Sequence, residues 1–390
     1  MTSIAIASTA SLNAEAATDL LSQISEQLES NAPEVLIVFA SPDNDYEALL
    51  GALNAEHNSA LIVGCSSAGE FTNDHAGTGR TSLVALYAPE MQFNAALAEG
   101  VAEGGGEAAA DRLVQGFKGV KSTDFRYRTG LLLVDALAGH TEEMVDQLTI
   151  ATGGMYQFVG GGAGDDARFS KTHVFLGAKA HTDAAVALEI LSNKPIGIGA
   201  RHGWCPASAP MRVTETEGST VKSLNISPAI EAFEEHAVES EQAFDRENPM
   251  PFFLHNIVGV KTDAGHKLRV PLGISDSGGI LCAAEVPSGS TAQIMSIGAS
   301  SATEAAADAV RDAMEQVTDA GHKPKAALFF DCVATRLRLG EEFATELDAV
   351  AEALGPVPFA GFNSYGQIVR AEGQFSGFHN CTAVACVFPE

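Results

Sequence analysis

The sequence predicts an α/β fold of the mixed α+β type, with two modules that contain mixed sheets and a repeated β-α-β element closed by a glycine loop. Short apolar and β-branched runs alternate with helical runs along the chain, which is the pattern of sheets joined by helices. The length of 390 residues is enough for two or three domains. One succession of strand, helix, strand and glycine loop recurs three times, which indicates an internal repeat.

The first elements follow from their hydrophobic periods. Residues 3–8 are typical of a strand, and Asn13 is placed to cap a helix that runs to about residue 29. The apolar run 34–40 suits a buried strand. Ser41-Pro42 is expected to open a second helix, and residues 60–64 form the next strand.

The repeated unit spans residues 34–70, 130–165 and 326–367. Its later copies contain helices predicted at 142–150 and 341–354. The closing loops are Gly64–Glu70, Gly160–Asp165 and Gly361–Gln367. Because the copies are few and far apart, they indicate a weak repeat and not a solenoid.

A module boundary is expected within residues 205–225. The segment 205–210 contains two prolines and small residues, which is typical of a loop. The sequence therefore predicts an N-terminal module at residues 1–215 and a C-terminal module at residues 216–390.

The formal net charge of −27 narrows the classes of partner. A strongly acidic surface repels phosphate backbones and anionic membranes, so we expect neither nucleic acid nor a membrane as partner. No apolar run reaches the length of about 18 residues that a membrane helix needs. The first basic residue is Arg80, which argues against a signal peptide, and we expect a cytoplasmic protein.

The glycine loops are the first candidate ligand site, because glycine lets backbone amides approach a ligand closely. Glu70 stands where a phosphate-binding loop requires Lys, and Asp165 and Asp166 would repel a pyrophosphate. The loops therefore favour a cationic or polar ligand group, with purely structural turn glycines as the alternative. The candidate ligand-binding residues are Ser66, Ser67, Gly69, Glu70, Gly162, Gly164, Asp165, Asn363, Ser364, Tyr365 and Gly366.

Catalytic patterns are incomplete, so we expect no enzyme. The glycines around Ser66 are one residue too far apart for a nucleophile elbow. Cys332 follows a strand and could pair with His379 as thiol and base, although a buried structural cysteine is the simpler interpretation. A hydrolase-like enzyme that uses Cys332 or Ser66 is thus the alternative from another class.

Several of these motifs together resemble the FIST proteins, which are sensory proteins with an N-terminal and a C-terminal FIST module. The similar segments are the three glycine loops, Gly199–Trp204 and Phe378–Thr382, in the expected order from about Glu34 to Thr382. The resemblance implies small-ligand sensing linked to signal transduction, and proposed ligands of the family include amino acids.

The chain is also similar to stand-alone FIST proteins that bind haem, sense nitric oxide and act on a histidine kinase or a cyclic-di-GMP enzyme. This similarity implies a haem cofactor. The alternative is a sensor of an amino-acid-type ligand without haem.

The segment Arg201-His202-Gly203-Trp204 is the candidate haem site. His202 could ligate the iron, Arg201 could meet a propionate, and Trp204 could stack on the ring. The glycines of the preceding strand, residues 195–200, would let a flat ring approach. Cys205 is the alternative axial ligand, and a hydrogen-bonded structural His202 is the alternative role.

A further polar segment, Asp135–Glu143, follows the strand of the second repeat. It is expected to contribute to a ligand cavity or a partner surface. Alternatively, Glu142 and Glu143 are helix-start acids that the helix dipole favours.

Overall fold

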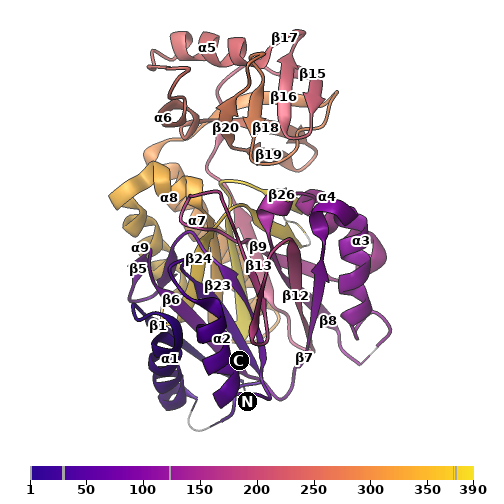
Figure 1. The fold of residues 1–390 in the computed structure, drawn as a ribbon, viewed down its shortest axis with the longest axis vertical. Helices are drawn as coiled ribbons and strands as arrows, with labels where there is room; N and C mark the ends of the chain where they lie inside the picture. Colours follow the sequence, from indigo (N-terminus) through magenta and orange to yellow (C-terminus); the bar gives the residue numbers. More distant parts are fainter. Residues whose placement is uncertain (1, 29–30, 123, 372, 374–375) are drawn as a thin grey trace.

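The computed structural model describes residues 2–28, 31–122, 124–371, 373 and 376–390. The chain forms a larger body from residues 2–201 and 299–390 and a smaller body from residues 205–297, which lies above it in Figure 1. The mixed sheets and connecting helices confirm the predicted fold class. The predicted limits 1–215 and 216–390 follow the order of the chain, whereas strands from both ranges build the larger body; these module limits stay a prediction.

The larger body contains three six-stranded mixed sheets, and each is built around one copy of the repeated unit. The paired strands of each unit are parallel, and their last residues pair as Ala40 with Ser66, Val134 with Gly162, and Cys332 with Ser364. The units are β2 (Val35–Ala40), α2 (Tyr46–Glu56) and β3 (Leu61–Ser66); β8 (Tyr127–Val134), α4 (Thr141–Ala151) and β9 (Gln157–Gly162); and β23 (Pro324–Cys332), α8 (Val333–Leu339), α9 (Phe343–Leu354) and β24 (Phe359–Ser364).

Each unit also gives a strand to the sheet of a neighbouring unit. After the first loop, β4 (Glu70–Thr72) pairs with β24 of the third unit. After the second loop, β10 (Val174–Leu176) pairs with β3 of the first, and after the third loop, β25 (Gln367–Arg370) pairs with β9 of the second. The exchange is cyclic and joins the three sheets into one ring.

The remaining strands of the larger body complete these sheets. They are β1 (Ser3–Thr9), β5 (Ala76–Gly77), β6 (Thr81–Tyr87), β7 (Gln92–Glu99), β11 (Lys179–His181), β12 (Ala184–Ser192), β13 (Gly197–Arg201), β26 (Ser376–His379) and β27 (Ala383–Pro389).

The core lies where the inner faces of the three sheets meet. Phe39, Leu133 and Phe330 come from the three units and belong to one buried cluster. The outer faces are covered by helices: α1 (Asn13–Gln27) with α2, α3 (Val101–Gly116) with α4, and α7 (Ala299–Asp319) with α9. Burial on both faces explains why these strands are continuous apolar runs without polar alternation.

The smaller body has its own core and is connected to the larger body through residues 202–204 and 297–298. Its core includes Val213, Phe233 and Phe253. Its elements are β14 (Cys205–Pro206), β15 (Met211–Glu217), β16 (Thr220–Leu224), β17 (Ser227–Pro228), α5 (Ala229–Glu239), α6 (Met250–Phe253), β18 (Asn256–Thr262), β19 (Gly265–Arg269), β20 (Pro271–Ile274), β21 (Ile280–Cys282) and β22 (Thr291–Ser296).

An ionic contact holds the two bodies together. Glu142, at the start of α4, accepts hydrogen bonds from Lys267 and from Arg269, the latter at 3.1 Å. The Arg269 guanidinium is buried and also donates to the Phe378 carbonyl at 2.9 Å. Glu142 therefore links the smaller body to the second sheet of the larger body.

Strand β13 shows why glycine is required where a helix packs directly on a sheet. A Cβ atom at Gly199 would lie 1.9 Å from the Ala309 carbonyl oxygen of α7. In α2, by contrast, a Cβ atom at Gly51 would meet no heavy atom within 4 Å. An added methyl group would therefore clash with backbone at position 199 and lie in open space at position 51.

We predict that Gly199→Ala lowers the free energy of unfolding by about 1–3 kcal/mol, because α7 must move away from β13. Gly51→Ala is the matched control and should raise it by about 0.5–1 kcal/mol, since glycine is costly inside a helix. Urea unfolding followed by circular dichroism measures both. Equal stability of Gly199→Ala and the unchanged protein would contradict the close packing.

Candidate functional site

The three glycine loops meet at the centre of the larger body. The Ala68 amide donates to the Asn363 carbonyl at 2.9 Å, and the Gly164 amide donates to the Ser66 carbonyl at 2.9 Å. The Tyr365 amide donates to the Gly162 carbonyl at 3.0 Å. Each loop therefore donates a backbone hydrogen bond to another loop, and together these contacts close a ring.

Most of the predicted ligand-binding side chains are engaged inside this centre. The Ser66 hydroxyl accepts from the His173 amide at 2.9 Å, and the Ser364 hydroxyl donates to the Asp331 carbonyl at 3.1 Å. The Asp165 carboxylate accepts from the amides of residues 169–171 at 2.8–2.9 Å and from the Tyr365 hydroxyl. These bonds hold the loops in shape, and ligand contact by these residues stays a prediction.

The loop glycines allow close backbone approach. A Cβ atom at Gly164 would lie 2.7 Å from the Ala68 amide nitrogen, and one at Gly162 would lie 2.6 Å from the Ala136 Cβ. Gly69 and Gly366 have φ values of +130° and +137°, which other residues rarely adopt. At these four positions the neighbour is protein, so the packing alone requires glycine.

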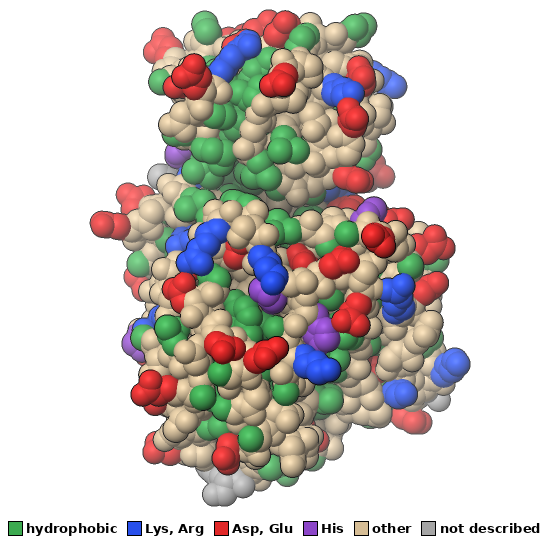
Figure 2. All heavy atoms as spheres, viewed as in Figure 1, with side chains coloured by type: hydrophobic (Ala, Val, Ile, Leu, Met, Phe, Trp, Pro, Cys, Tyr) green, Lys and Arg blue, Asp and Glu red, His purple; other side chains and the backbone are tan. Residues whose placement is uncertain are grey.

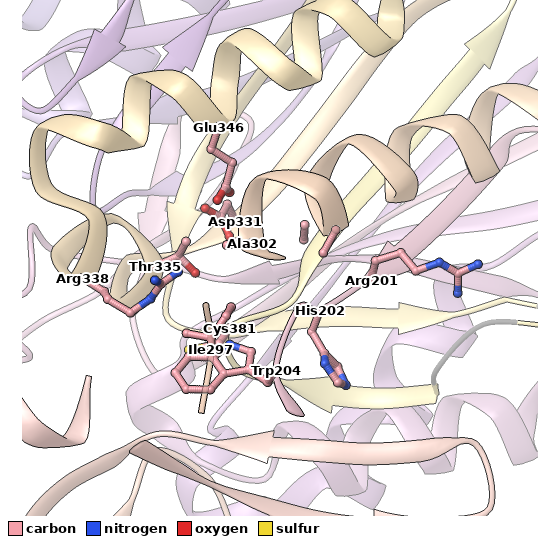
Figure 3. A pocket seen from close by; sticks show the side chains of 13 residues that line it. Arg201, His202, Trp204, Ile297, Ala302, Asp331, Thr335, Arg338, Glu346 and Cys381 are labelled. Atoms are coloured by element: carbon pink, nitrogen blue, oxygen red, sulfur yellow. The ribbon is translucent and has the colours of Figure 1, made fainter. Parts of the chain in front are cut away.

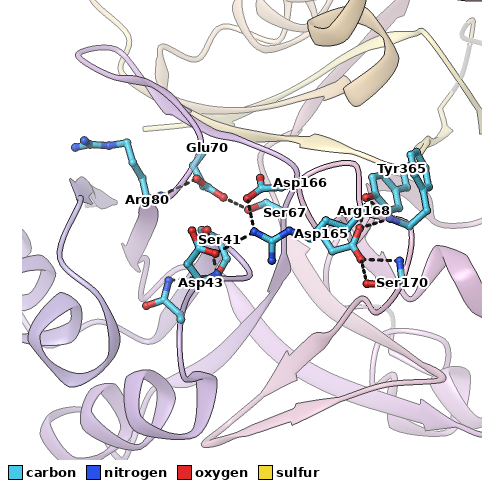
Figure 4. A network of polar contacts seen from close by, with 12 residues as sticks. Ser41, Asp43, Ser67, Glu70, Arg80, Asp165, Asp166, Arg168, Ser170 and Tyr365 are labelled. Carbon is cyan, nitrogen blue, oxygen red and sulfur yellow. Dashed lines mark hydrogen bonds and ion pairs between the residues drawn. The ribbon is translucent and has the colours of Figure 1, made fainter. Parts of the chain in front are cut away.

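An acidic cluster borders this centre (Figure 4). Burial raises the pKa of Glu70 to about 8, against the opposing effect of hydrogen bonds from the Ser67 hydroxyl and the Arg80 amide. Burial also raises the pKa of Asp166, whereas Arg336 of α8 lowers it. Arg168 bridges Asp43 at 3.1 Å and Asp166 at 3.9 Å.

A small polar pocket lies at the predicted Arg201–Trp204 segment (Figure 3). Its free volume is about 10 Å³, which is room for about one water molecule. It is formed by the end of β13, the start of α7, helices α8 and α9, and the loop before β27. The lining residues are Arg201, His202, Gly203, Trp204, Ile297, Ala302, Ala305, Asp331, Thr335, Arg338, Glu346, Cys381 and Ala383.

Two buried carboxyl groups face each other in this pocket. Asp331 lies next to the end of β23 and Glu346 lies in the first turn of α9; each is 1% exposed. Burial raises the pKa of Asp331 to about 6. Burial, and then the charge of Asp331, raise the pKa of Glu346 well above its usual value. Burial and the neighbouring carboxyl therefore both favour a proton held by the pair.

The two carboxyl groups are hydrogen-bonded to each other, and the Thr335 hydroxyl is hydrogen-bonded to Asp331. Beyond this pairing, Asp331 Oδ2 and Glu346 Oε2 make no hydrogen bond to any described part of the chain. The same holds for the Nε of Arg338, whose guanidinium lies 5.8 Å from the centre of the Trp204 ring. Since buried polar atoms are almost always paired, acceptors and a donor without partners in one pocket indicate a place for a ligand.

Sequence reasoning did not select Asp331, Glu346 or Arg338, yet signals for the two acids exist. Asp331 ends an apolar strand that is buried on both faces. Glu346 lies on the same face of α9 as Phe343 and Val350, which are both buried. A charged residue at a buried position of an apolar period is unusual and signals a specific role.

The residues predicted to hold haem do not fit that group in this structure. Arg201 pairs with Asp312 at 2.7 Å and extends away from Trp204 (Figure 3). The glycine backbone of β13 packs against α7 and offers no free face to a flat ring. The free volume of about 10 Å³ is also far below the 300–1,000 Å³ that is usual for ligands of drug size, and haem is larger than most of these.

Of the two predicted iron ligands, His202 lines the polar pocket and Cys205 does not. Burial lowers the pKa of His202, so the imidazole is neutral. Cys205 is exposed on β14 of the smaller body, and His379 is buried at the end of β26. Among the described residues, no three His, Cys, Asp or Glu side chains are grouped as metal ligands.

The two candidate nucleophiles and the Asp135–Glu143 segment have structural contacts. Ser66 and Cys332 are buried, and the Cys332 thiol is hydrogen-bonded to Cys381. Asp135 accepts hydrogen bonds from the Leu137 and Asp183 amides, at 3.1 and 2.7 Å. Whether the chain is an enzyme stays a prediction, as does the expected role of this segment in a cavity or partner surface.

The carboxyl pair predicts a pH dependence of stability. Since both pKa values are raised on folding, the folded protein binds more protons than the unfolded chain above about pH 4. The free energy of unfolding should therefore fall as pH rises from about 4.5 to 8. Glu346→Gln removes one titrating group and should flatten this fall, which urea unfolding at several pH values measures.

Glu352→Gln is the matched control, because Glu352 is exposed on the same helix. It should leave the slope unchanged. Glu70 contributes a slope of the same sign, because its pKa is also raised, and it remains in both variants. Identical slopes for Glu346→Gln and Glu352→Gln would contradict a proton held by the carboxyl pair.

Among the described residues, no helix has the length and apolar character to cross a membrane.

Comparisons with known proteins give weak structural likenesses and a family. The search of curated proteins finds no significant match. Solved structures with similarity include cyanuric acid hydrolase from A. caulinodans, at 8% identity, 99% coverage of both chains and a TM-score of 0.34. Another is PurL of T. maritima complexed with ATP, at 11% identity, 100% and 71% coverage and a TM-score of 0.24. Likenesses this weak support no inference about function.

Two family matches cover most of the chain in sequence order. The FIST N domain matches residues 34–226, and the FIST C domain matches residues 229–370. The chain therefore belongs to the FIST family.

Proposed function

We propose that this protein is a sensor of a small amine-bearing molecule of the amino-acid type, which binds in the polar pocket between β23, α8 and α9. FIST domains generally bind small ligands in signalling. The observation that carries the proposal is the pair of buried carboxyls, Asp331 and Glu346, of which Oδ2 and Oε2 have no partner outside the pair.

The chemistry of the pocket selects a cationic group. Two buried carboxyls are costly unless a cation or a shared proton compensates them. An ammonium group has three donors and would satisfy Oδ2 of Asp331 and Oε2 of Glu346. Its binding would displace the proton of the pair, so affinity should rise with pH.

The opposite wall suits an anionic group. Arg338 Nε lacks a partner, and a guanidinium binds carboxylate strongly. Trp204 supplies an apolar surface beside it. Ammonium at the acids and carboxylate at Arg338 is the pattern of a small amino acid, and the free volume of about 10 Å³ means that the pocket must widen to admit one.

The position of the pocket suggests how binding would be reported. Trp204 ends one of the two connections between the bodies, and Ile297 begins the other. A ligand held there contacts both connections and would favour one arrangement of the smaller body. We propose that the partner, such as a histidine kinase or a cyclic-di-GMP enzyme, responds to this arrangement.

The direct test is thermal unfolding with glycine, methylamine and acetate as probes. Glycine and methylamine should raise the melting temperature, with about 2.7 kcal/mol of stabilisation at a concentration of 100 times Kd. Acetate should not. Asp331→Asn should abolish the shift, whereas Asp348→Asn, an exposed acid on α9, should keep it.

The variant Arg338→Met tests recognition of the carboxylate separately from recognition of the ammonium group. It should weaken the binding of glycine by about tenfold or more and leave the binding of methylamine nearly unchanged, since only glycine carries a carboxylate. If Asp331→Asn and Asp348→Asn respond alike to glycine and methylamine, the carboxyl pair is not the ligand site.

The haem hypothesis leads to a different result. We predict that protein purified from haem-supplied cells shows no Soret absorption band, because the space around His202 does not fit haem. A Soret band that is present in the unchanged protein and lost in His202→Ala would restore the haem-based nitric oxide sensor as the leading hypothesis.

A further inference from the structure

A second pocket, with a free volume of about 50 Å³, lies between the two bodies, on the other side of α8. Met250, Leu254 and Leu272 of the smaller body form one wall. Val333 and Leu337 of α8 and Tyr365 of the third glycine loop form the opposite wall. Figure 2 shows hydrophobic side chains extending from the smaller body down to its boundary with the larger one.

The lining is apolar and uncharged, in a chain with a net charge of −27. Its few polar groups are already engaged. The Tyr365 hydroxyl donates a hydrogen bond to Asp165. The side-chain oxygen Oδ1 of Asn380 accepts one from the Val270 amide at 3.3 Å. The pocket therefore offers apolar contact and no compensation for a ligand charge, which selects a neutral molecule.

Two aromatic rings at the pocket are stacked. The rings of Phe169 and Tyr365 have centres 4.4 Å apart and planes inclined by 15°. Phe169 is 44% exposed and Leu337 is 45% exposed, so both lie at the mouth. A flat face of two aligned rings beside aliphatic side chains suits an aromatic ligand, which gains from stacking as well as from burial.

The segment that carries Phe169 has an unusual backbone. Asp166, Ala167 and Phe169 have φ values of +55°, +61° and +49°, which residues with a side chain rarely adopt. The Asp165 carboxylate holds this segment through the amides of residues 169–171. Backbone strain of this kind is typical of functional sites, and here it places an apolar ring at the mouth of a pocket.

We propose that this pocket is a binding site for a neutral, apolar small molecule that carries an aromatic ring. The pocket is lined by residues of both bodies and is open at Phe169 and Leu337, where a ring can enter. The site is separate from the polar pocket, which α8 faces with Thr335 and Arg338. Failure of either proposal leaves the other unaffected.

The test uses the full chain with two neutral probes, N-phenyl-1-naphthylamine followed by its fluorescence and p-cresol followed by saturation-transfer nuclear magnetic resonance. Both should bind the unchanged protein. Leu337→Asp places a charge at the mouth of the pocket and should weaken binding of the dye by about tenfold or more. Val238→Asp is the matched control on α5, where Val238 is 80% exposed, and should change dye binding by no more than about twofold.

Phe169→Ala tests the stacked ring separately and should weaken binding of the dye by about three- to tenfold. Circular dichroism melts of each variant establish that the fold is kept, which is expected because Leu337 and Phe169 are half-exposed. The proposal is overturned if neither probe binds the unchanged protein, or if Leu337→Asp and Val238→Asp bind the dye equally well.

Discussion

Backbone hydrogen bonds among three loops that are far apart in the sequence organise the larger body. Each loop ends a parallel strand pair, donates an amide to another loop and then gives its next strand to a neighbouring sheet. Such close approach of backbones excludes most side chains, which explains glycine at position 164; at position 366 the Phe378 ring and the positive φ require it. The three sheets can share one core only in the orientation that these contacts set.

Helix α8 lies where this centre meets the smaller body, and its seven residues face three surroundings. Thr335 and Arg338 line the polar pocket, whereas Val333 and Leu337 line the apolar one. Arg336 lies near Glu70 and Asp166 at the loop centre. A movement of this one helix would therefore change both proposed sites together, as coupling between ligands requires two sites that bias one element.

The sequence was informative where structure is local and weaker where it depends on distant pairing. The strand at residues 34–40 and the three glycine loops were predictable, because an apolar run and a turn residue have local causes. The second helix begins at Tyr46 and not at Pro42, since Asp45 caps it through the Ala48 amide. The glycines of β13 were interpreted as open to a ring, but sequence alone cannot distinguish approach by a ligand from approach by α7. Asp331 and Glu346 are brought together only by tertiary packing.

The cyclic exchange of strands has a consequence for how the chain reaches its fold. Strand β4 finds its partner β24 almost 300 residues later, and β13 pairs with β27 only at the end of the chain. During synthesis the first sheet can form early, because β10 follows within about 100 residues of β3. The third sheet must wait until residues 324–389 have emerged. Folding of the larger body thus has a high contact order, with edge strands exposed for most of translation, which favours slow folding and help from chaperones.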